Sequence, residues 1–157
     1  MWRRRRPFTA WIYTAKRCCR SFFGSSVRST GLYGSGFLYC YPEEITEELI
    51  QVMKQEPKIC HYLDMPIQHA SDKILAKMGR RTRREELEGI IGRLREEIPD
   101  ICLRTTLISG FPGETEKDHE ELLDFVNLME FDRLGVFTYS QEENTPAAEM
   151  PDQVDER

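Results

Sequence analysis

The chain has 157 residues, 39% of them hydrophobic and 31% charged, a composition typical of one globular domain rather than of a disordered chain. Its 22 Lys and Arg residues against 27 Asp and Glu residues give a net charge of −5, which does not favour nucleic-acid binding. No run approaches ~18 consecutive apolar residues, so a transmembrane helix is excluded.

The first 36 residues differ in charge from the rest of the chain. They contain eight basic residues and no Asp or Glu, whereas the other 121 residues carry a net charge of −13. Three interpretations fit this segment: an organelle transit peptide, a basic arm that binds RNA, or translated sequence that is not native coding sequence.

Two short apolar runs, each ended by a proline, predict buried strands over residues 37–41 and 59–65. Between them, Thr46 followed by two glutamates predicts the start of a helix, because a threonine caps a helix and acids favour its first turn. The apolar face of this helix is formed by Ile45, Leu49, Ile50 and Met53.

Three further helices and two further strands are expected. Ser71 is a candidate cap for a helix that runs to Met78, and Thr82 with Glu85 has the capping-box pattern for the next helix. Thr115 with Asp118 repeats that pattern. Apolar residues recur at helical spacing behind both boxes, as Leu87, Ile90, Ile91, Leu94, Ile98 and as Leu122, Leu123, Val126, Met129. Strands are expected over residues 101–109 and 132–140.

Alternating strands and helices with short connections indicate parallel βαβ units, so the predicted fold class is α/β. Ligands of such folds bind in the loops after the strands, here 40–44, 66–72, 110–115 and 139–141. Helix capping alone explains four polar residues of these loops, Ser71, Asp72, Glu114 and Thr115. It does not explain Gln68 and His69, because neither is a preferred helix cap.

The glycine turn and the cysteines exclude several kinds of site. The turn over residues 110–113 lacks the Gly-Lys-Ser/Thr ending of a phosphate-binding loop. Five cysteines, at 18, 19, 40, 60 and 102, are an odd number without C-x2-C spacing. They therefore predict neither a disulfide framework nor a zinc or iron–sulfur site, and we expect reduced cysteines.

Four ordered blocks together resemble the radical S-adenosylmethionine methylthiotransferases. They are Leu38-Tyr39-Cys40-Tyr41-Pro42-Glu43, Tyr62-Leu63-Asp64-Met65-Pro66-Ile67-Gln68-His69-Ala70-Ser71-Asp72, Gly79-Arg80-Arg81, and Leu103-Arg104-Thr105-Thr106-Leu107-Ile108-Ser109-Gly110-Phe111-Pro112-Gly113-Glu114-Thr115. Tyr139-Ser140 followed by Thr145-Pro146-Ala147 is also similar to the family. The Gln-His-Ala-Ser-Asp form at 68–72 resembles the branch that acts on a ribosomal protein, since the branch acting on transfer RNA usually shows Gln-Ser-Gly-Ser-Asp.

The resemblance implies that residues 37–157 form the latter part of a partial (β/α) TIM-like barrel with about four parallel strands. It also implies three absent parts: an amino-terminal cluster-binding domain, a C-x3-C-x2-C loop for the radical-generating [4Fe–4S] cluster, and a small carboxy-terminal TRAM-like β-barrel domain. Adjacent Cys18 and Cys19 cannot replace the cysteine triad. Since the resemblance begins abruptly at Phe37, we favour a reading-frame change or truncated gene model for residues 1–36.

The resemblance further assigns residues to S-adenosylmethionine and to the substrate. Gln68 and Thr106 match positions near the ribose of the cofactor, and Arg80 matches a residue that pairs with its carboxylate. The alternative for Arg80 is a solvated place in the arginine cluster of residues 80–84. Ile108 and the turn Gly110, Phe111, Pro112, Gly113 match the segment against adenine, and His69 and Tyr139 are assigned to the protein substrate. No metal ligand and no catalytic residue is identified.

The implied function is that of a transferase that inserts a methylthio group at the β-carbon of an aspartate in a small-subunit ribosomal protein. The alternatives are a transfer-RNA methylthiotransferase of the same family and a non-catalytic remnant without a cluster. The expected partners are the ribosomal protein and the ribosome, with no membrane or DNA, and the expected location is the cytoplasm. An unpaired edge of the strand at 38–41 also predicts a poorly soluble or oligomeric chain.

Overall fold

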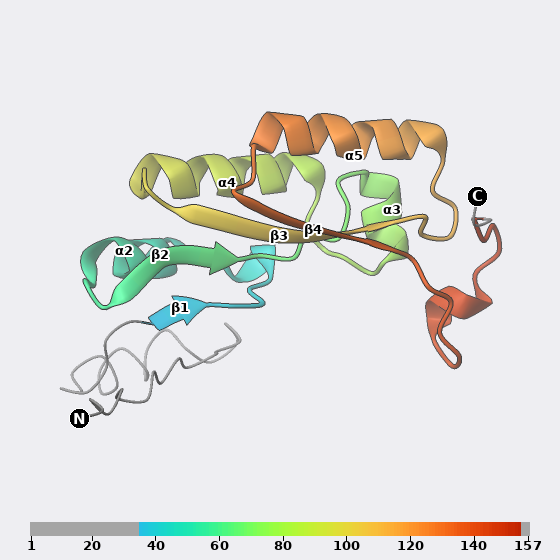
Figure 1. The fold of residues 1–157 in the computed structure, drawn as a ribbon, viewed down its shortest axis with the longest axis horizontal. Coiled ribbons are helices and arrows are strands. Elements are labelled where there is room, and N and C mark those ends of the chain that lie inside the picture. Colours follow the sequence, from blue (N-terminus) through green and yellow to red (C-terminus); the bar gives the residue numbers. More distant parts are fainter. Residues whose placement is uncertain (1–34, 155–157) are drawn as a thin grey trace, which may run out of the picture.

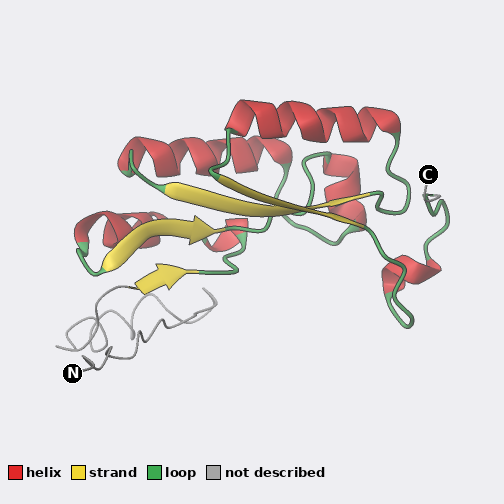
Figure 2. Ribbon diagram, viewed as in Figure 1, coloured by secondary structure: helices red, strands yellow, loops and turns green. Residues whose placement is uncertain are grey.

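A computed structural model describes residues 35–154, which form one sheet of four parallel strands in the order β1-β2-β3-β4 (Figure 1). The strands are β1 (Ser35–Phe37), β2 (Ile59–Asp64), β3 (Cys102–Ser109) and β4 (Arg133–Thr138). Each is followed along the chain by helical segments, as Figure 2 shows, so the predicted α/β class with parallel strands is confirmed.

Four α-helices connect or follow these strands, and α3, α4 and α5 lie on one side of the sheet in Figure 1. They are α2 (Glu47–Gln55), α3 (Asp72–Lys77), α4 (Arg84–Glu97) and α5 (Glu116–Met129), with short 3-10 turns at η2 (Pro42–Glu44) and η3 (Pro146–Glu149). None of the helices in the described part of the chain has the length and apolarity needed to cross a membrane.

The hydrophobic core lies between the sheet and the helices. Along β3, Leu103, Thr105 and Leu107 are buried while Arg104 and Thr106 between them stay partly exposed, because successive side chains of a strand point to opposite faces. The core is completed by the apolar faces that the sequence predicts for the helices, including Leu49, Ile50, Met53, Leu87, Ile91, Leu94, Leu122 and Phe125.

Two of the predicted helix caps are confirmed and one is wrong. Thr46 and Thr115 accept hydrogen bonds from the amides of Leu49 and Asp118, as expected. The helix α4 begins one residue later than Thr82 predicts, since the cap residue is Arg83, whose amide donates to Glu86 Oε2 at 2.7 Å. The Thr82 hydroxyl is used elsewhere: it donates to Glu43 of η2 at 3.1 Å.

The first strand also differs from the prediction. It covers Ser35–Phe37 instead of residues 37–41, because Tyr39 takes a left-handed conformation (φ 57°) that ends the strand. Residues 35 and 36 therefore belong to the sheet, although the prediction grouped them with residues 1–34 as a segment outside the family resemblance. The prediction for residues 1–34 lies outside the described residues. The other three predicted strands are confirmed, each within two residues at either end.

Candidate cofactor-binding site

Two adjoining cavities lie on the face of the sheet opposite the core and bring together most of the predicted cofactor residues. The first, of about 350 Å³, is lined by Tyr39, Cys40, Tyr41, Pro66, Gln68, Arg80, Arg104, Thr106 and Phe137. The second, also about 350 Å³, shares Gln68, Thr106 and Phe137 with it and adds Ile108, Phe111 and Tyr139 among others. One elongated ligand can therefore contact both groups of residues.

Gln68 is placed in both cavities by a strained backbone. Its φ of 73° lies in the left-handed region, which is costly for a residue with a side chain and is characteristic of functional sites. The conformation is held from β3, because the Gln68 amide donates to Thr106 O at 3.0 Å and its carbonyl accepts from Ile108 N at 2.8 Å. Tyr39, the other strained residue of the first cavity, lies at the end of β1.

Arg80 belongs to the cavity wall. Its Nη2 donates to the carbonyl of Pro66 at 3.3 Å, and its guanidinium lies over the ring of Tyr41, 5.2 Å from the centroid. These two contacts fix the guanidinium at the carboxyl end of β2. The remaining N–H groups of a fixed guanidinium suit a carboxylate, which accepts two parallel hydrogen bonds.

A glycine on β4, Gly135, leaves free space beside three residues of the first cavity. Gly135 pairs with Thr106 in the register of β3 and β4, so both lie on the same sheet face. A Cβ at Gly135 would meet the Phe137 ring at 3.7 Å, Thr106 Oγ1 at 3.8 Å and Arg104 Nη2 at 3.9 Å. The glycine thus leaves a hollow among three cavity residues that any larger residue would fill.

The turn after β3 needs both of its glycines. Gly110 and Gly113 have φ values of +79° and +82°, where a side chain is strained, and a Cβ at Gly113 would collide with Lys77 Nζ. Phe111 packs edge-on against Tyr139, with ring centroids 5.4 Å apart. The Tyr139 hydroxyl is buried without a hydrogen-bond partner among the described residues, as is expected where a ligand completes a site.

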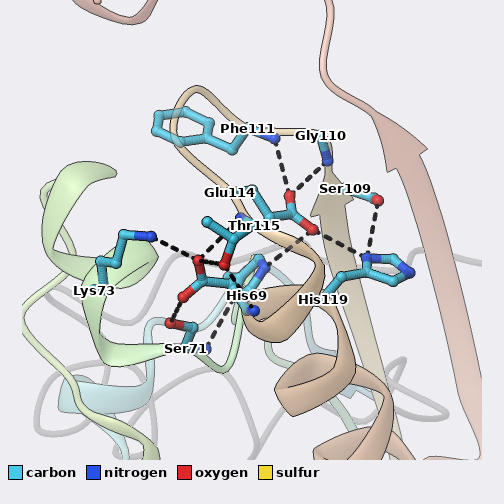
Figure 3. A network of polar contacts seen from close by, with 10 residues as sticks. His69, Ser71, Lys73, Ser109, Gly110, Phe111, Glu114, Thr115 and His119 are labelled. Atoms are coloured by element: carbon cyan, nitrogen blue, oxygen red, sulfur yellow. Dashed lines mark hydrogen bonds and ion pairs between the residues drawn. The ribbon is translucent and has the colours of Figure 1, made fainter. Parts of the chain in front are cut away.

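A carboxylate behind this turn determines its shape (Figure 3). Glu114 Oε2 accepts from the amides of Gly110 at 2.6 Å and Phe111 at 3.0 Å, while Oε1 lies 3.0 Å from His119 Nδ1 and 3.6 Å from His69 Nε2. Burial alone would raise the pKa of Glu114, but the contacts with both histidines and with the Phe111 amide outweigh it and lower the pKa. The site therefore holds this turn with a charged side chain.

His69 is fully buried, so the predicted contact with a protein substrate does not fit its position. Its Nδ1 accepts from the Ser71 amide at 2.9 Å, which satisfies one of the open N–H groups where α3 begins. With Nδ1 as an acceptor, the ring proton is on Nε2, which lies 3.6 Å from Glu114 Oε1 and has no hydrogen-bond partner among the described residues. His69 is thus a positioning residue that links the loop after β2 to the turn after β3.

Asp118 joins the same two loops through a second set of hydrogen bonds. It accepts from the hydroxyl of Ser71 at 2.7 Å, from Lys73 Nζ at 2.7 Å and from the hydroxyl of Thr115 at 2.6 Å. Burial raises the pKa of this carboxyl, but these donors together hold the pKa far below its usual range. Ser71 therefore stands at the predicted cap position of α3 without capping it, because its hydroxyl is bound to Asp118.

The cavity residues fit S-adenosylmethionine, whereas the described residues do not fit an iron–sulfur cluster. The first cavity offers two guanidinium groups, an amide and three hydroxyls, those of Tyr39, Tyr41 and Thr106, and none of its lining side chains is a carboxylate. By contrast, residues 35–154 contain no group of three His, Cys, Asp or Glu side chains that could hold a metal ion.

Residues 36–126 match the Radical SAM superfamily, and the chain belongs to this superfamily. It is 71% identical over 116 residues to the "Ribosomal protein uS12 methylthiotransferase RimO" of Lachnoclostridium phytofermentans, and 62% identical over 127 residues to the protein of that name in Geobacter sulfurreducens. These matches cover 74% and 81% of this chain but 26% and 28% of the two relatives, so the chain spans about a quarter of their length.

A solved structure shares the fold. The radical SAM enzyme coproporphyrinogen III oxidase (HemN) of Escherichia coli superposes with a TM-score of 0.59 at 23% identity, over 69% of this chain and 24% of that protein. The predicted radical-SAM type of barrel is confirmed by this likeness together with the superfamily match.

Sequence reasoning assigned no role to six residues that line the first cavity, Tyr39, Cys40, Tyr41, Pro66, Arg104 and Phe137. The period of two in β3 could have identified Arg104, because it has the same parity as Thr106 and Ile108. The role of Glu114 was predicted only as a helix cap. Its two bonds to the glycine turn depend on a left-handed backbone that no local pattern specifies.

Proposed function

We propose that this chain is the cofactor-binding part of a ribosomal protein uS12 methylthiotransferase, which inserts a methylthio group at the β-carbon of an aspartate. The observation that carries the proposal is the cavity at the carboxyl ends of β2 and β3, in which Gln68, Arg80 and Thr106 meet. Loops at the carboxyl ends of parallel strands are where such folds bind ligands. The 71% identity to a relative of that name makes this substrate class the best supported.

Each cavity residue has a task that its position supports. Arg80, fixed by Pro66 and Tyr41, would bind the methionine carboxylate of S-adenosylmethionine with two parallel hydrogen bonds. Gln68 and Thr106 line the same cavity, and the Gln68 amide donates to the Thr106 carbonyl; their side chains would bind the ribose hydroxyls. The second cavity, with Ile108 and Phe111, would receive the adenine. Gly110 and Gly113 do not line this cavity, and their part would be to shape the turn that carries Phe111.

S-adenosylmethionine supplies the radical and the methyl group in this class of enzyme. The chain's own residues would hold it in place: Glu114 and His69 fix the turn that would lie against adenine, and Asp118 fixes the starts of α3 and α5. Tyr139, whose buried hydroxyl lacks a protein partner, lies at the end of the second cavity, where the protein substrate would approach. We place this activity in the cytoplasm, on the ribosome or on its free protein.

The test uses an assembled enzyme, in which this chain replaces the matching 116 residues of the Lachnoclostridium phytofermentans relative. After anaerobic reconstitution with iron and sulfide, it is incubated with S-adenosylmethionine and either uS12 or transfer RNA, and the products are analysed by mass spectrometry. We expect a methylthio group on uS12 and none on transfer RNA.

Two variants make the test specific to the cavity. Arg80→Met removes the guanidinium of the cavity wall and should abolish most of the transfer, while Arg81→Met changes a neighbouring exposed residue and should not. Modification of transfer RNA would show that the chain belongs to the branch of the family that acts on transfer RNA. No transfer to either substrate, with the cluster loaded, would identify a non-catalytic remnant.

A further inference from the structure

Arg104 is a charged residue of the first cavity to which the proposed cofactor site gives no role. It lies in the middle of β3, two residues before Thr106, so both side chains point to the same face of the sheet. Arg80 already supplies a guanidinium for the carboxylate of the cofactor, yet Arg104 lines the same cavity as a second one.

A buried carboxylate, that of Asp64, fixes the position of the Arg104 guanidinium. Its Nη1 donates to Asp64 Oδ2 at 2.7 Å, and the Asp64 side chain is only 2% exposed, whereas that of Arg104 is 36% exposed. Among the described residues, Asp64 is the one hydrogen-bond partner of this guanidinium. Asp64 fixes one side of the planar fork, and the other N–H groups remain available to a ligand.

The surroundings of Arg104 favour an anion. The lining of the cavity contains no other charged residue except Arg80, and Nη2 of Arg104 would be within 3.9 Å of a Cβ at Gly135, so it borders the open hollow there. Asp64 itself is not satisfied by the pair, since its buried Oδ1 has no hydrogen-bond partner among the described residues.

We propose that Arg104, positioned by Asp64, binds the carboxylate of the substrate aspartate. The inference rests on the proposed function and adds to it the residue that recognises the substrate. A guanidinium that binds both oxygens of a carboxylate fixes its plane, and thereby the adjacent β-carbon that is to be modified. An unmodified adenosine carries no carboxylate, so Arg104 would also favour an aspartate over such a base.

The experiment compares the parent assembled enzyme with Arg104→Met, using two peptides of uS12 sequence that have either aspartate or asparagine at the modified position. The loss of one charged pair should raise the KM for the aspartate peptide by about 10-fold to 100-fold. It should also remove the preference of the parent for aspartate over asparagine. The Kd for S-adenosylmethionine is measured beside it, and a weaker Kd with an unchanged preference for aspartate would assign Arg104 to the cofactor and overturn the inference.

Two further variants control for structure. Arg133→Met removes an exposed arginine that lies directly opposite Arg104 in the register of β3 and β4, and should leave both KM values unchanged. Arg104→Lys keeps a positive partner for the buried Asp64, so it should fold even if Arg104→Met does not. It loses the planar fork, and we expect a KM between those of the parent and Arg104→Met.

The outcomes separate this inference from the proposed function. If the parent modifies uS12 and both Arg104 variants keep its KM and its preference for aspartate, Arg104 does not bind the substrate. If the parent instead modifies transfer RNA, the ligand of Arg104 is not an aspartate and the inference fails. A parent that modifies neither substrate refutes the proposed function and the inference with it.

Discussion

Glu114 offers the sharpest test of how the turn at residues 110–113 is held. The change of Glu114 to Ala removes the acceptor of the Gly110 and Phe111 amides at 2.6 and 3.0 Å, from a side chain that is 5% exposed. Hydrogen bonds to a charged group contribute about 1.5–3 kcal/mol each, so we expect the free energy of unfolding to fall by ~3–5 kcal/mol. The Glu114–His119 contact adds little, because that histidine is 44% exposed.

Glu114→Gln should cost less, about 1–2 kcal/mol. The amide keeps an oxygen for the two turn amides, but its NH2 group then faces the Nε2 proton of His69. Urea unfolding followed by circular dichroism gives both values by linear extrapolation. Glu120→Ala, on the exposed side of α5, is the matched control and should stay within ~0.5 kcal/mol of the parent. A Glu114→Ala protein that loses less than ~1 kcal/mol would show that the turn does not depend on this carboxylate.

Three other predictions concern strain, acid and the sheet edge. Gln68→Gly should leave the free energy of unfolding unchanged or raise it by up to ~1 kcal/mol in urea titrations, because the left-handed backbone is relieved; a clear loss would show that Gln68 is not strained. The lowered pKa values of Glu114 and Asp118 mean that their contribution to stability is complete above their ordinary values near ~4 and is lost as the pH falls toward the lowered ones. The urea concentration at the unfolding midpoint should thus be constant from pH 7 to about pH 5 and fall below about pH 4. If the midpoint of Asp118→Asn falls by the same amount, Asp118 does not contribute to this loss of stability in acid. Leu134, Val136 and Phe137 are exposed on the edge strand β4, so Val136→Lys should reduce self-association in size-exclusion chromatography. A parent chain that elutes as a monomer at all concentrations would show that this edge does not self-associate.

The fold could be predicted from the sequence because its signals are local. Prolines end the buried run at 59–65, and Thr46 and Thr115 cap helices through their own side chains, so both kinds of boundary follow from one or two residues. The errors arise where the boundary of an element depends on a contact or a backbone conformation that the local sequence pattern does not specify. The start of α4 moved because Thr82 binds Glu43, and β1 moved because Tyr39 leaves the strand in a left-handed conformation.

The site was less predictable than the fold, because its residues come from segments that are far apart in the sequence. The resemblance brought Gln68, Arg80 and Thr106 to notice, and the structure places all three in one cavity. His69 was assigned to the substrate because it marks the branch that acts on a ribosomal protein, yet its ring nitrogen accepts a bond at the start of α3, which only the fold reveals. Arg104 needed the pairing with the buried Asp64 before its position in the cavity acquired a meaning.

The central claim is that this chain forms the S-adenosylmethionine site, and an equilibrium titration of the cofactor tests it most directly. In the assembled enzyme, Gln68→Ala should weaken binding by ~1–2 kcal/mol, about 5-fold to 30-fold in Kd, because the hydrogen bonds of its amide are lost. The iron content should stay unchanged, and Gln55→Ala, on the exposed end of α2, should bind as the parent does. Equal affinity of Gln68→Ala and the parent would contradict the assignment of the cavity and leave Gln68 a loop residue.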